Sequence, residues 1–288
     1  MFAVSKRNQI TTDSVMDQFS GKLAIITGAG SGIGRALAKR CAAEGMRLAV
    51  ADVQAGRLES LKAQLEGEGA TVLTHTLDVS EAQAFQTFAE RCRTELGAPD
   101  LLFNNAGILR LGETWSHPAD EWEKTLSINI MGVVNGLNAF VPAMLEEGKP
   151  AHIINTGSVG SLVAAPGMAQ YTATKMAVRG ITECLHNDLV AQNAAIDVSL
   201  LCPGPVLTSI SDELLGLEPG TEEIDPATHM MAGQPDFISA DECADRVFSA
   251  IVERRFWIFP HPFNQYINDM TQTIVSGKNP AYREVQFD

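Results

Sequence analysis

Thr27-Gly28-Ala29-Gly30-Ser31-Gly32-Ile33-Gly34 is the most informative segment of this sequence. It follows a short apolar run at 23–27 and opens an amphipathic stretch at 33–44. A glycine-rich turn between a strand and a helix is typical of a phosphate site, because the backbone amides and the dipole at the start of the helix attract an anion. The spacing is Gly-x3-Gly-x-Gly, and the strict Gly-x-Gly-x2-Gly pattern fails because Ile33 stands where its last glycine would fall. The alternative is a tight connection in which small residues serve only close packing.

After this turn, short β-branched or aliphatic runs alternate with longer amphipathic stretches. Several runs are apolar almost throughout, which is typical of parallel strands covered by helices on both faces. The sequence therefore predicts an α/β protein with a single-domain Rossmann fold, a doubly wound parallel sheet of about seven strands with helices on both faces. The expected strands are 23–27, 47–52, 71–77, 100–104, 152–156, 196–202 and 256–259, and the expected helices are 33–44, 55–66, 81–96, 118–145, 169–190 and 240–253.

The two ends of the chain and one internal segment differ from this series. Residues 1–15 are polar and aperiodic, so we expect a flexible N-terminal extension, with Met16 as a second candidate for the native start. Residues 16–260 form the predicted domain. Within it, 205–238 is rich in Gly, Pro and acidic residues and is expected to be a mobile lid, after which Ser239 caps a helix. Residues 261–288 are expected to form a C-terminal helix and tail.

The composition excludes several functional classes. A formal net charge of −14, from 35 acidic and 21 basic residues, repels phosphate backbones and anionic lipids, so neither nucleic acid nor a membrane is an expected partner. The five cysteines lack the spacing of a zinc site and are expected to be buried thiols in a reducing compartment. No apolar run looks long enough to cross a bilayer, and no leader sequence opens the chain. These observations predict a cytoplasmic protein that needs no metal.

Acidic residues close two of the expected strands. Asp52 stands twenty residues after Gly32, where a carboxylate accepts hydrogen bonds from the ribose hydroxyls of an adenosine. It would repel a 2′-phosphate by an energy on the order of a few kcal/mol, so the predicted cofactor is NAD rather than NADP. The alternative is that Asp52 caps the following helix. Asp78, followed by Val79, is expected near the adenine amine or as the cap of the next helix.

Tyr171 and Lys175 are four residues apart in an expected helix, so both side chains project from one face. A free phenol titrates at about 10, and an ammonium about 4 Å away supplies the energy that lowers this pKa by roughly three units. The alternative is a surface helix with a half-buried tyrosine. Ser158 follows the fifth expected strand, so its hydroxyl should reach the same edge of the sheet and polarise a substrate oxygen.

Over nearly all of 20–259 the sequence resembles the short-chain dehydrogenase/reductase family. The family's signatures occur in order and at the family's spacing. The resemblance implies an NAD(H)-dependent oxidoreductase that interconverts a secondary alcohol and a ketone by hydride transfer. The matching segments are the turn 28–34, Asn104-Asn105-Ala106-Gly107, Asn129, Ser158, Tyr171-x3-Lys175, and Pro203-Gly204 with Thr208.

The resemblance also implies a role for each matching residue. Tyr171 would be the general acid/base, and Lys175 would lower its pKa and bind the nicotinamide ribose. Ser158 would orient the substrate oxygen. Asn129 would hold a water that links Lys175 to solvent, and its alternative role is a bond to backbone inside the helix. The expected cofactor contacts are Gly28, Gly30, Ser31, Gly32, Ile33, Gly34, Asp52, Asp78, Val79, Asn105, Ala106, Gly107, Tyr171, Lys175, Pro203, Gly204, Val206 and Thr208, with 203–204 alternatively a plain loop after the sixth strand.

The expected substrate pocket is mostly apolar, which favours a hydrophobic cyclic or aryl alcohol. The runs 201–205 and 259–262 are also similar to dehydrogenases of aryl-alkyl carbinols, the lignin-type Cα-dehydrogenases among them. The expected pocket residues are Leu109, Arg110, Val159, Leu162, Val163, Leu214, Leu217, Met230 and Met231.

Other functional classes are weighed against this one. A dehydratase or epimerase on the same fold and a dinucleotide-binding protein without turnover remain open. A serine hydrolase is disfavoured because Gly157-Ser158-Val159-Gly160 is not a nucleophile elbow, and an enoyl reductase spaces its Tyr and Lys farther apart. The family resemblance further implies a homodimer or homotetramer formed through the two long helices, 118–145 and 169–190.

Overall fold

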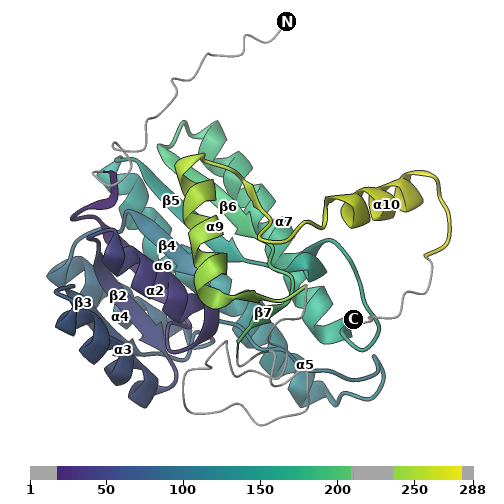
Figure 1. Cartoon of the computed structure of the whole chain (residues 1–288), viewed down its shortest axis with the longest axis horizontal. Coiled ribbons are helices and arrows are strands. Elements are labelled where there is room, and N and C mark those ends of the chain that lie inside the picture. Colours follow the sequence, from purple (N-terminus) through teal and green to yellow (C-terminus); the bar gives the residue numbers. More distant parts are fainter. Residues whose placement is uncertain (1–17, 209, 211–235, 281–288) are drawn as a thin grey trace, which may run out of the picture.

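The fold is a parallel sheet between two layers of helices (Figure 1). The structure is a computed structural model that describes residues 18–208, 210 and 236–280. The seven strands of the main sheet lie in the order β3-β2-β1-β4-β5-β6-β9, all parallel, as the sequence predicts. The strands are β1 (Leu23–Thr27), β2 (Arg47–Asp52), β3 (Val72–Thr76), β4 (Leu101–Asn104), β5 (Ala151–Thr156), β6 (Ile196–Leu201) and β9 (Trp257–Ile258).

Alternate residues of each strand point to opposite faces, so the sheet has two separate cores. In β1, Ala24 and Ile26 pack under α2, α3 and α9, whereas Leu23 and Ile25 pack under α4, α6 and α7. Because both faces are covered, the strands read as continuous apolar runs rather than alternating ones. The helices are α2 (Gly32–Ala43), α3 (Ala55–Gly67), α4 (Ala82–Glu95), α5 (Ala119–Leu126), α6 (Gly132–Glu147), α7 (Ala169–Ala191), α9 (Ala240–Val252) and α10 (Asn264–Val275).

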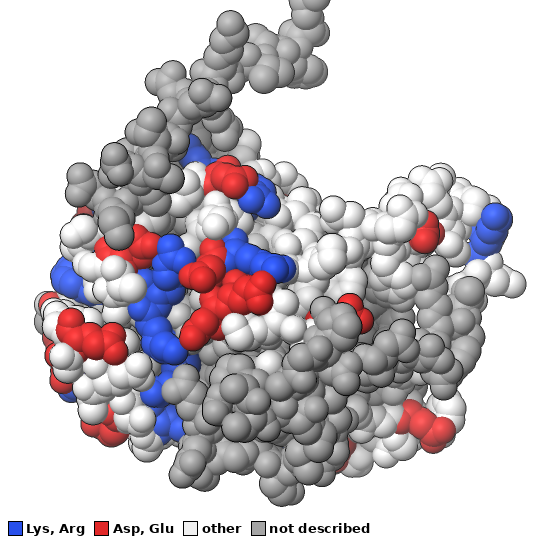
Figure 2. Space-filling view, viewed as in Figure 1, with Lys and Arg blue, Asp and Glu red and all other residues white. Residues whose placement is uncertain are grey.

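The helices α2 and α9 lie side by side although some 200 residues separate them in the chain (Figure 1). Figure 2 shows acidic and basic side chains interleaved over this pair of helices. Lys39 pairs with Asp241 at 3.2 Å, and Arg40 pairs with Asp245 at 2.5 Å. Because these pairs are solvent-exposed, each contributes at most about 1 kcal/mol, and the buried apolar contacts beneath them supply most of the stability.

The predicted helix at 118–145 is continuous but not uniform. A π-helical turn, Ser127–Met131, separates α5 from α6, and it places Asn129 inside the protein. By length and composition the whole stretch Ala119–Glu147 could span a membrane, so the prediction that no segment is long and apolar enough is wrong. Val133, Phe140 and Met144 of α6 are buried in the protein, as in a core helix. The length of this helix was predicted, but its apolar residues are interrupted by polar ones and so form no single long apolar run.

The chain after β6 departs from the regular alternation. β7 (Val206–Leu207) and β8 (Ile238–Ser239) pair with each other in a small parallel sheet. They are the ends of the predicted lid, of which residues 209 and 211–235 lie outside the described residues, as do 1–17 and 281–288. Ser239 caps α9, as predicted, by accepting a hydrogen bond from the amide of Glu242. The segment from β9 to α10 then crosses back over the carboxyl edge of the sheet, and α10 extends away from it (Figure 1).

Candidate active site

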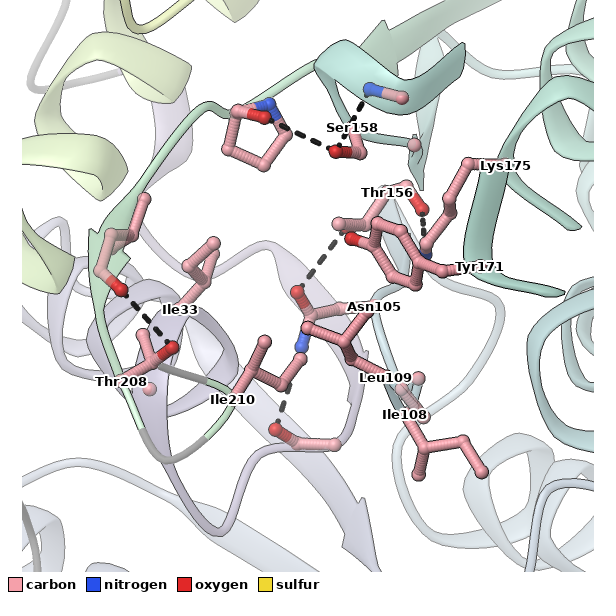
Figure 3. Close-up of a pocket in the computed structure, with 18 of the residues that line it drawn as sticks. Ile33, Asn105, Ile108, Leu109, Thr156, Ser158, Tyr171, Lys175, Thr208 and Ile210 are labelled. Atoms are coloured by element: carbon pink, nitrogen blue, oxygen red, sulfur yellow. Dashed lines mark hydrogen bonds between the residues drawn. The ribbon is translucent and has the colours of Figure 1, made fainter. Parts of the chain in front are cut away.

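A cavity of about 1250 Å³, the carboxyl-edge cavity, opens at the carboxyl edge of the sheet. It lies over β1 and β4, where the strand order changes direction, and such crevices bind ligands in open α/β sheets. One end reaches Asp52, and the other holds Ser158, Tyr171 and Lys175, which Figure 3 shows facing the same space.

The glycine turn brings the start of α2 against the neighbouring loops. Gly28 has a φ of +65°, and a Cβ on it would lie 2.8 Å from the Cα of Ala106. A Cβ on Gly34 would collide with the carbonyl oxygen of Gly28, and one on Gly32 would lie 2.9 Å from Thr208. Gly32 lines the cavity, whereas Gly34 serves packing. Gly34 thus fits the packing interpretation, and Gly32 has the position in the cavity that the predicted phosphate site requires.

The first amides of α2 are available to an anion. Its N-cap, Ser31, makes no side-chain cap hydrogen bond, and Ser31, Gly32 and Ile33 all line the cavity. Amide donors at a helix start that lack intrahelical partners bind phosphate readily. This part of the cavity therefore fits a pyrophosphate.

Asp52 lies at the end of the cavity, as the sequence predicts. Its Oδ2 accepts the amide of Gly30 at 2.9 Å, and its Oδ1 accepts the amide of Gln54 at the start of α3. Asp52 thus shapes the turn before α3 and lines the cavity, and the alternative that it caps the helix is wrong, because the N-cap of α3 is Gln54. Gly30 itself does not line the cavity. It positions Asp52 instead.

Asp78 and Val79, two further predicted cofactor contacts, also line the cavity. Asp78 accepts hydrogen bonds from the amide and the hydroxyl of Ser80, at 2.9 and 2.7 Å, and so shapes the turn before α4. Val79 is buried, and its carbonyl accepts the side-chain amide of Asn135 at 2.9 Å. Asp78 thus has a turn-forming role as well as a place in the wall.

The Asn105-Ala106-Gly107 turn is fastened to β1 by Thr27. The Thr27 hydroxyl accepts the amides of Asn105 and Ala106, at 3.0 and 3.2 Å. The side-chain amide of Asn105 donates to the carbonyl of Thr27 at 3.1 Å, and its oxygen accepts the hydroxyl of Thr156 at 3.2 Å. Thr27 and Thr156 were not predicted as site residues, because no local pattern distinguishes them from other strand residues.

Ser158, Tyr171 and Lys175 meet at the other end of the cavity. Ser158 caps a short turn, accepting the amide of Gly160 at 3.1 Å, and its hydroxyl donates to the carbonyl of Pro203 at 3.5 Å. Lys175 donates to the carbonyl of Thr156 at 2.8 Å, and its Nζ lies 5.5 Å from the centre of the Tyr171 ring. All three side chains are buried. The alternative of a surface helix with a half-buried tyrosine is wrong for this segment.

The pKa of Tyr171 differs from the expectation. Burial raises the pKa of this phenol above its usual value, and the neighbouring Ser158 side chain acts in the opposite direction. The prediction that the pKa of Tyr171 is lowered is therefore wrong for this structure, because burial is the largest influence on it. Burial also lowers the pKa of Lys175, to about 8. The tyrosine of this structure is a neutral phenol near neutral pH.

Asn129 lies behind the cavity rather than in its wall. Its side-chain amide donates to the carbonyl of Ile108 at 2.9 Å and to the hydroxyl of Thr174 at 3.0 Å, and its oxygen accepts the Ile108 amide at 2.8 Å. This is the backbone-bonded alternative, and it links the loop after β4 to α7. A relay water held by this amide nitrogen would have to displace one of these bonds.

The loop after β6 completes the wall. Pro203, Gly204, Val206 and Thr208 all line the cavity, as predicted. Phe263 and Tyr266, from the C-terminal segment, line it as well and were not predicted. Their sequence carries no motif, and only the return of the chain over the sheet edge brings them there.

The predicted substrate residues divide into three groups. Leu109, Arg110, Val159 and Val163 line the cavity. Leu162 instead packs against the buried side chains of Val133, Val178 and Leu200. The remaining ones, Leu214, Leu217, Met230 and Met231, lie outside the described residues.

The chain belongs to the short-chain dehydrogenase family, because the family model with the description "short chain dehydrogenase" matches residues 22–216. It is 33% identical over 285 residues to a CLA biosynthesis dehydrogenase/reductase of Lactiplantibacillus plantarum, covering 92% of this chain and 97% of that protein. It is 35% identical over 242 residues to a 1-deoxy-11-beta-hydroxypentalenate dehydrogenase of Streptomyces arenae, covering 83% and 82% of the two chains.

Solved structures agree with this assignment. A short-chain dehydrogenase/reductase from Burkholderia phymatum, crystallised in complex with NAD, superimposes with a TM-score of 0.84 at 36% sequence identity. The match covers 93% of this chain and 99% of that one. The predicted Rossmann fold and the predicted family are therefore confirmed, and the chain is an oxidoreductase of this family.

Proposed function

We propose that this chain interconverts a secondary alcohol and a ketone by hydride transfer with NAD(H). The observation that carries the proposal is that one cavity holds Ser158, Tyr171 and Lys175 at one end and Asp52 at the other. A dinucleotide bound along this cavity would place its adenosine near Asp52, its pyrophosphate at the start of α2 and its nicotinamide near Tyr171. When bound, oxidised nicotinamide supplies the hydride acceptor and a positive charge beside the phenol.

Tyr171 is proposed as the general acid/base. Because burial keeps its phenol neutral, it holds a proton ready for the oxygen of a ketone. In the opposite direction it must accept the proton of the alcohol, and the positive charges of Lys175 and of the oxidised cofactor favour its ionised form. Ser158, which lines the same cavity as Tyr171, orients the substrate oxygen. Asn129 is proposed to act by holding the loop after β4 against α7.

NAD is the proposed cofactor, rather than NADP. The carboxylate of Asp52 lines the adenosine end, and it would repel a 2′-phosphate. Its orientation is fixed by the amides of Gly30 and Gln54, so it keeps lone pairs for ribose hydroxyls. The Burkholderia phymatum relative, whose structure contains NAD, supports the same choice.

The proposed substrate is a hydrophobic cyclic or aryl alcohol. Apolar and aromatic side chains line much of the cavity, together with Arg110, Lys124 and Thr172, and apolar walls bind apolar bodies. The hydroxypentalenate dehydrogenase among the relatives is named for an alcohol on a carbocyclic skeleton, which supports this class. The apolar and aromatic residues include Ile108, Leu109, Val159, Val163, Met168, Phe263 and Tyr266.

We further propose that the protein is cytoplasmic and forms a homodimer or homotetramer. Exposed apolar side chains on the stretch Ala119–Glu147 and on α7 support the assembly, among them Leu126, Met131 and Met176. The low pI of about 4.8 and the net charge of −14 support the absence of nucleic-acid partners.

The test is oxidation of a panel of alicyclic and benzylic secondary alcohols with NAD⁺ and with NADP⁺. We expect turnover with NAD⁺, reduced about 10²–10⁴-fold in Tyr171→Phe. Cys184→Ser is the control, because it changes an exposed side chain on the same helix outside the cavity and should leave turnover in place. Tight NADH binding without turnover on any substrate would instead indicate a dinucleotide-binding protein. A product with unchanged oxidation state would indicate a dehydratase or epimerase.

A further inference from the structure

His261 is a buried histidine bonded to the loop that carries Pro203, Gly204 and Pro205. Only 5% of it is exposed. Its Nδ1 lies 3.0 Å from the amide nitrogen of Gly204, and its Nε2 lies 2.9 Å from the carbonyl oxygen of Pro205. An amide can only donate and a carbonyl can only accept, so Nδ1 is the acceptor and Nε2 carries the proton. The ring is therefore the neutral Nε2–H tautomer.

The residues after His261 form part of the cavity wall. The ring of Phe263 stacks on that of His261, with centroids 5.5 Å apart and an angle of 21° between the planes. A Cβ on Gly204 would collide with the ring of Phe263 and lie 3.1 Å from Cγ of His261. Phe263, Tyr266 and Gly204 all line the cavity. The imidazole thus sits where two walls of the cavity join.

We propose that His261 is a positioning residue that fixes the loop 203–205 against the C-terminal segment, so that its protonation loosens both walls and weakens binding of cofactor and substrate. The inference rests on the proposed function, since Pro203 and Gly204 are expected cofactor contacts and line the cavity that is proposed to hold NAD(H). Protonation of Nδ1 removes the acceptor for the Gly204 amide and places two N–H groups against each other. The Gly204 amide is the single backbone donor between two prolines, so no neighbour replaces the lost bond.

Charged groups near the ring come from α9 and from the segment before it. Burial lowers the pKa of His261, and Arg246 lowers it further, while the Pro205 carbonyl, Asp236 and Glu242 raise it. Arg246 also donates to the carbonyl of Pro260 and pairs with Glu242. The loop 203–205 brings no titratable side chain, and α10 brings Tyr266 to the same cavity. The pKa of His261 in the folded protein lies below 6.5. The hydrogen bond from the Gly204 amide is therefore fully formed above pH 6.5, and it is lost as the pH falls through the pKa of the folded protein.

The test compares wild type with His261→Asn and His261→Leu. Asn keeps an acceptor at the position of Nδ1 but does not titrate near neutrality, whereas Leu removes the acceptor. NADH affinity is measured by fluorescence at about pH 8 and about pH 5. We expect wild type to lose about tenfold in affinity on acidification, the Asn variant to change by less than about threefold, and the Leu variant to bind about tenfold more weakly at both values.

A second readout does not depend on cofactor binding. The exchange rate of the Gly204 amide proton, followed by NMR, should be slow in wild type and the Asn variant and faster in the Leu variant at about pH 8. Calorimetry identifies any variant that fails to fold. Equal amide exchange in all three proteins, or the same pH dependence of NADH affinity in all three, would overturn the proposal. If wild type binds no NADH at any pH, the proposed function fails, and the exchange rates alone decide the role of His261.

Discussion

The backbone amide of Gly30 donates a 2.9 Å hydrogen bond to Oδ2 of Asp52 and thereby ties the glycine turn to the end of β2. The carboxylate is held at the end of the carboxyl-edge cavity with Arg57 beside it in the wall. A Cβ on Gly30 would lie 2.8 Å from Cγ of Asp52 and 3.0 Å from Cβ of Arg57. The position of this negative charge is therefore built into the turn.

Replacing Asp52 should change the choice of cofactor. In Asp52→Ser the repulsion of a 2′-phosphate disappears, so we expect the kcat/KM ratio of NADP⁺ to NAD⁺ to rise by at least about tenfold. Steady-state kinetics with both cofactors measures this ratio. A wild-type protein that already prefers NADP⁺ would show that Asp52 does not select the cofactor.

Gly34→Ala should destabilise the protein. The new methyl group would overlap the carbonyl oxygen of Gly28, so either the turn or the start of α2 must move. Denaturant titration should show a loss of about 1–3 kcal/mol in the free energy of unfolding, with weaker NADH binding. Gly67→Ala is the matched control, because a Cβ on Gly67 meets no atom within 4 Å. The free energy of unfolding of Gly67→Ala should equal that of wild type or exceed it by up to about 1 kcal/mol.

His152 should make the fold sensitive to acid. Its Nε2 lies 2.7 Å from the hydroxyl of Ser199, which donates to the Arg255 carbonyl and so must accept from the ring. Burial lowers the pKa of His152 from 6.5 to about 4, so the neutral ring is the form that the fold favours. The neutral ring contributes fully to the free energy of unfolding above pH 6.5. This contribution, roughly 3 kcal/mol in total, is lost as the pH falls towards 4.

The measurement for His152 is the free energy of unfolding as a function of pH. Between pH 6.5 and 4 the curve of His152→Gln should be flatter than that of wild type, because glutamine does not titrate. Parallel curves would mean that other groups dominate acid unfolding.

A thiol reagent should modify one cysteine of the native protein. Cys184 is exposed on α7, whereas the other four are buried. Burial raises the pKa of Cys92, Cys202 and Cys243 to about 12 and that of Cys41 as well, so their thiolates are absent near neutrality. After labelling of the native protein, mass spectrometry should find one adduct on wild type and none on Cys184→Ser. Rapid labelling of a second cysteine would contradict this assignment.

The proposed assembly makes a prediction about mass. Met131 and Met176 are exposed, and α5 and α7 are joined by the hydrogen bond from Thr125 to Gln170. A charge in an apolar interface is unfavourable, so Met176→Glu should shift sedimentation towards the 30.9 kDa monomer. Val275→Glu, on α10, is the control that should leave the assembly intact. A wild-type protein that sediments as a monomer would refute the proposal.

The sequence predicted the fold and most of the cavity because those signals are local. The strand of 47–52 was placed to the residue, and Gly32 and Asp52 were placed in the cavity wall, because each follows directly from a strand end. The partner of Lys175 was not predictable, since its bond to the Thr156 carbonyl depends on how α7 packs on β5. The pKa of Tyr171 was mispredicted for the same reason, because burial outweighs one cation whose position is set by tertiary packing.

Long-range contacts account for the other omissions. His261 and Gly204 are 57 residues apart, and no motif links them. Asn129 was recognised by its spacing, but its bonds to Ile108 and Thr174 depend on a π-helical turn that the periodicity of the helix does not reveal. Gly30 and Gly34 are predicted cofactor contacts that do not line the cavity, and the close approach of Asp52 to Gly30 and of the Gly28 carbonyl to Gly34 depends on tertiary packing.

Because of the strand order, the two ends of the cavity are formed by different parts of the chain. Everything at the adenosine end comes from residues before Ile108, and nearly all of the wall around Tyr171 comes from residues after it. The two halves can therefore diverge independently during evolution. A substitution near Phe263, in the stretch that returns over the sheet edge, can therefore alter the wall around Tyr171 and leave the residues around Asp52 unchanged.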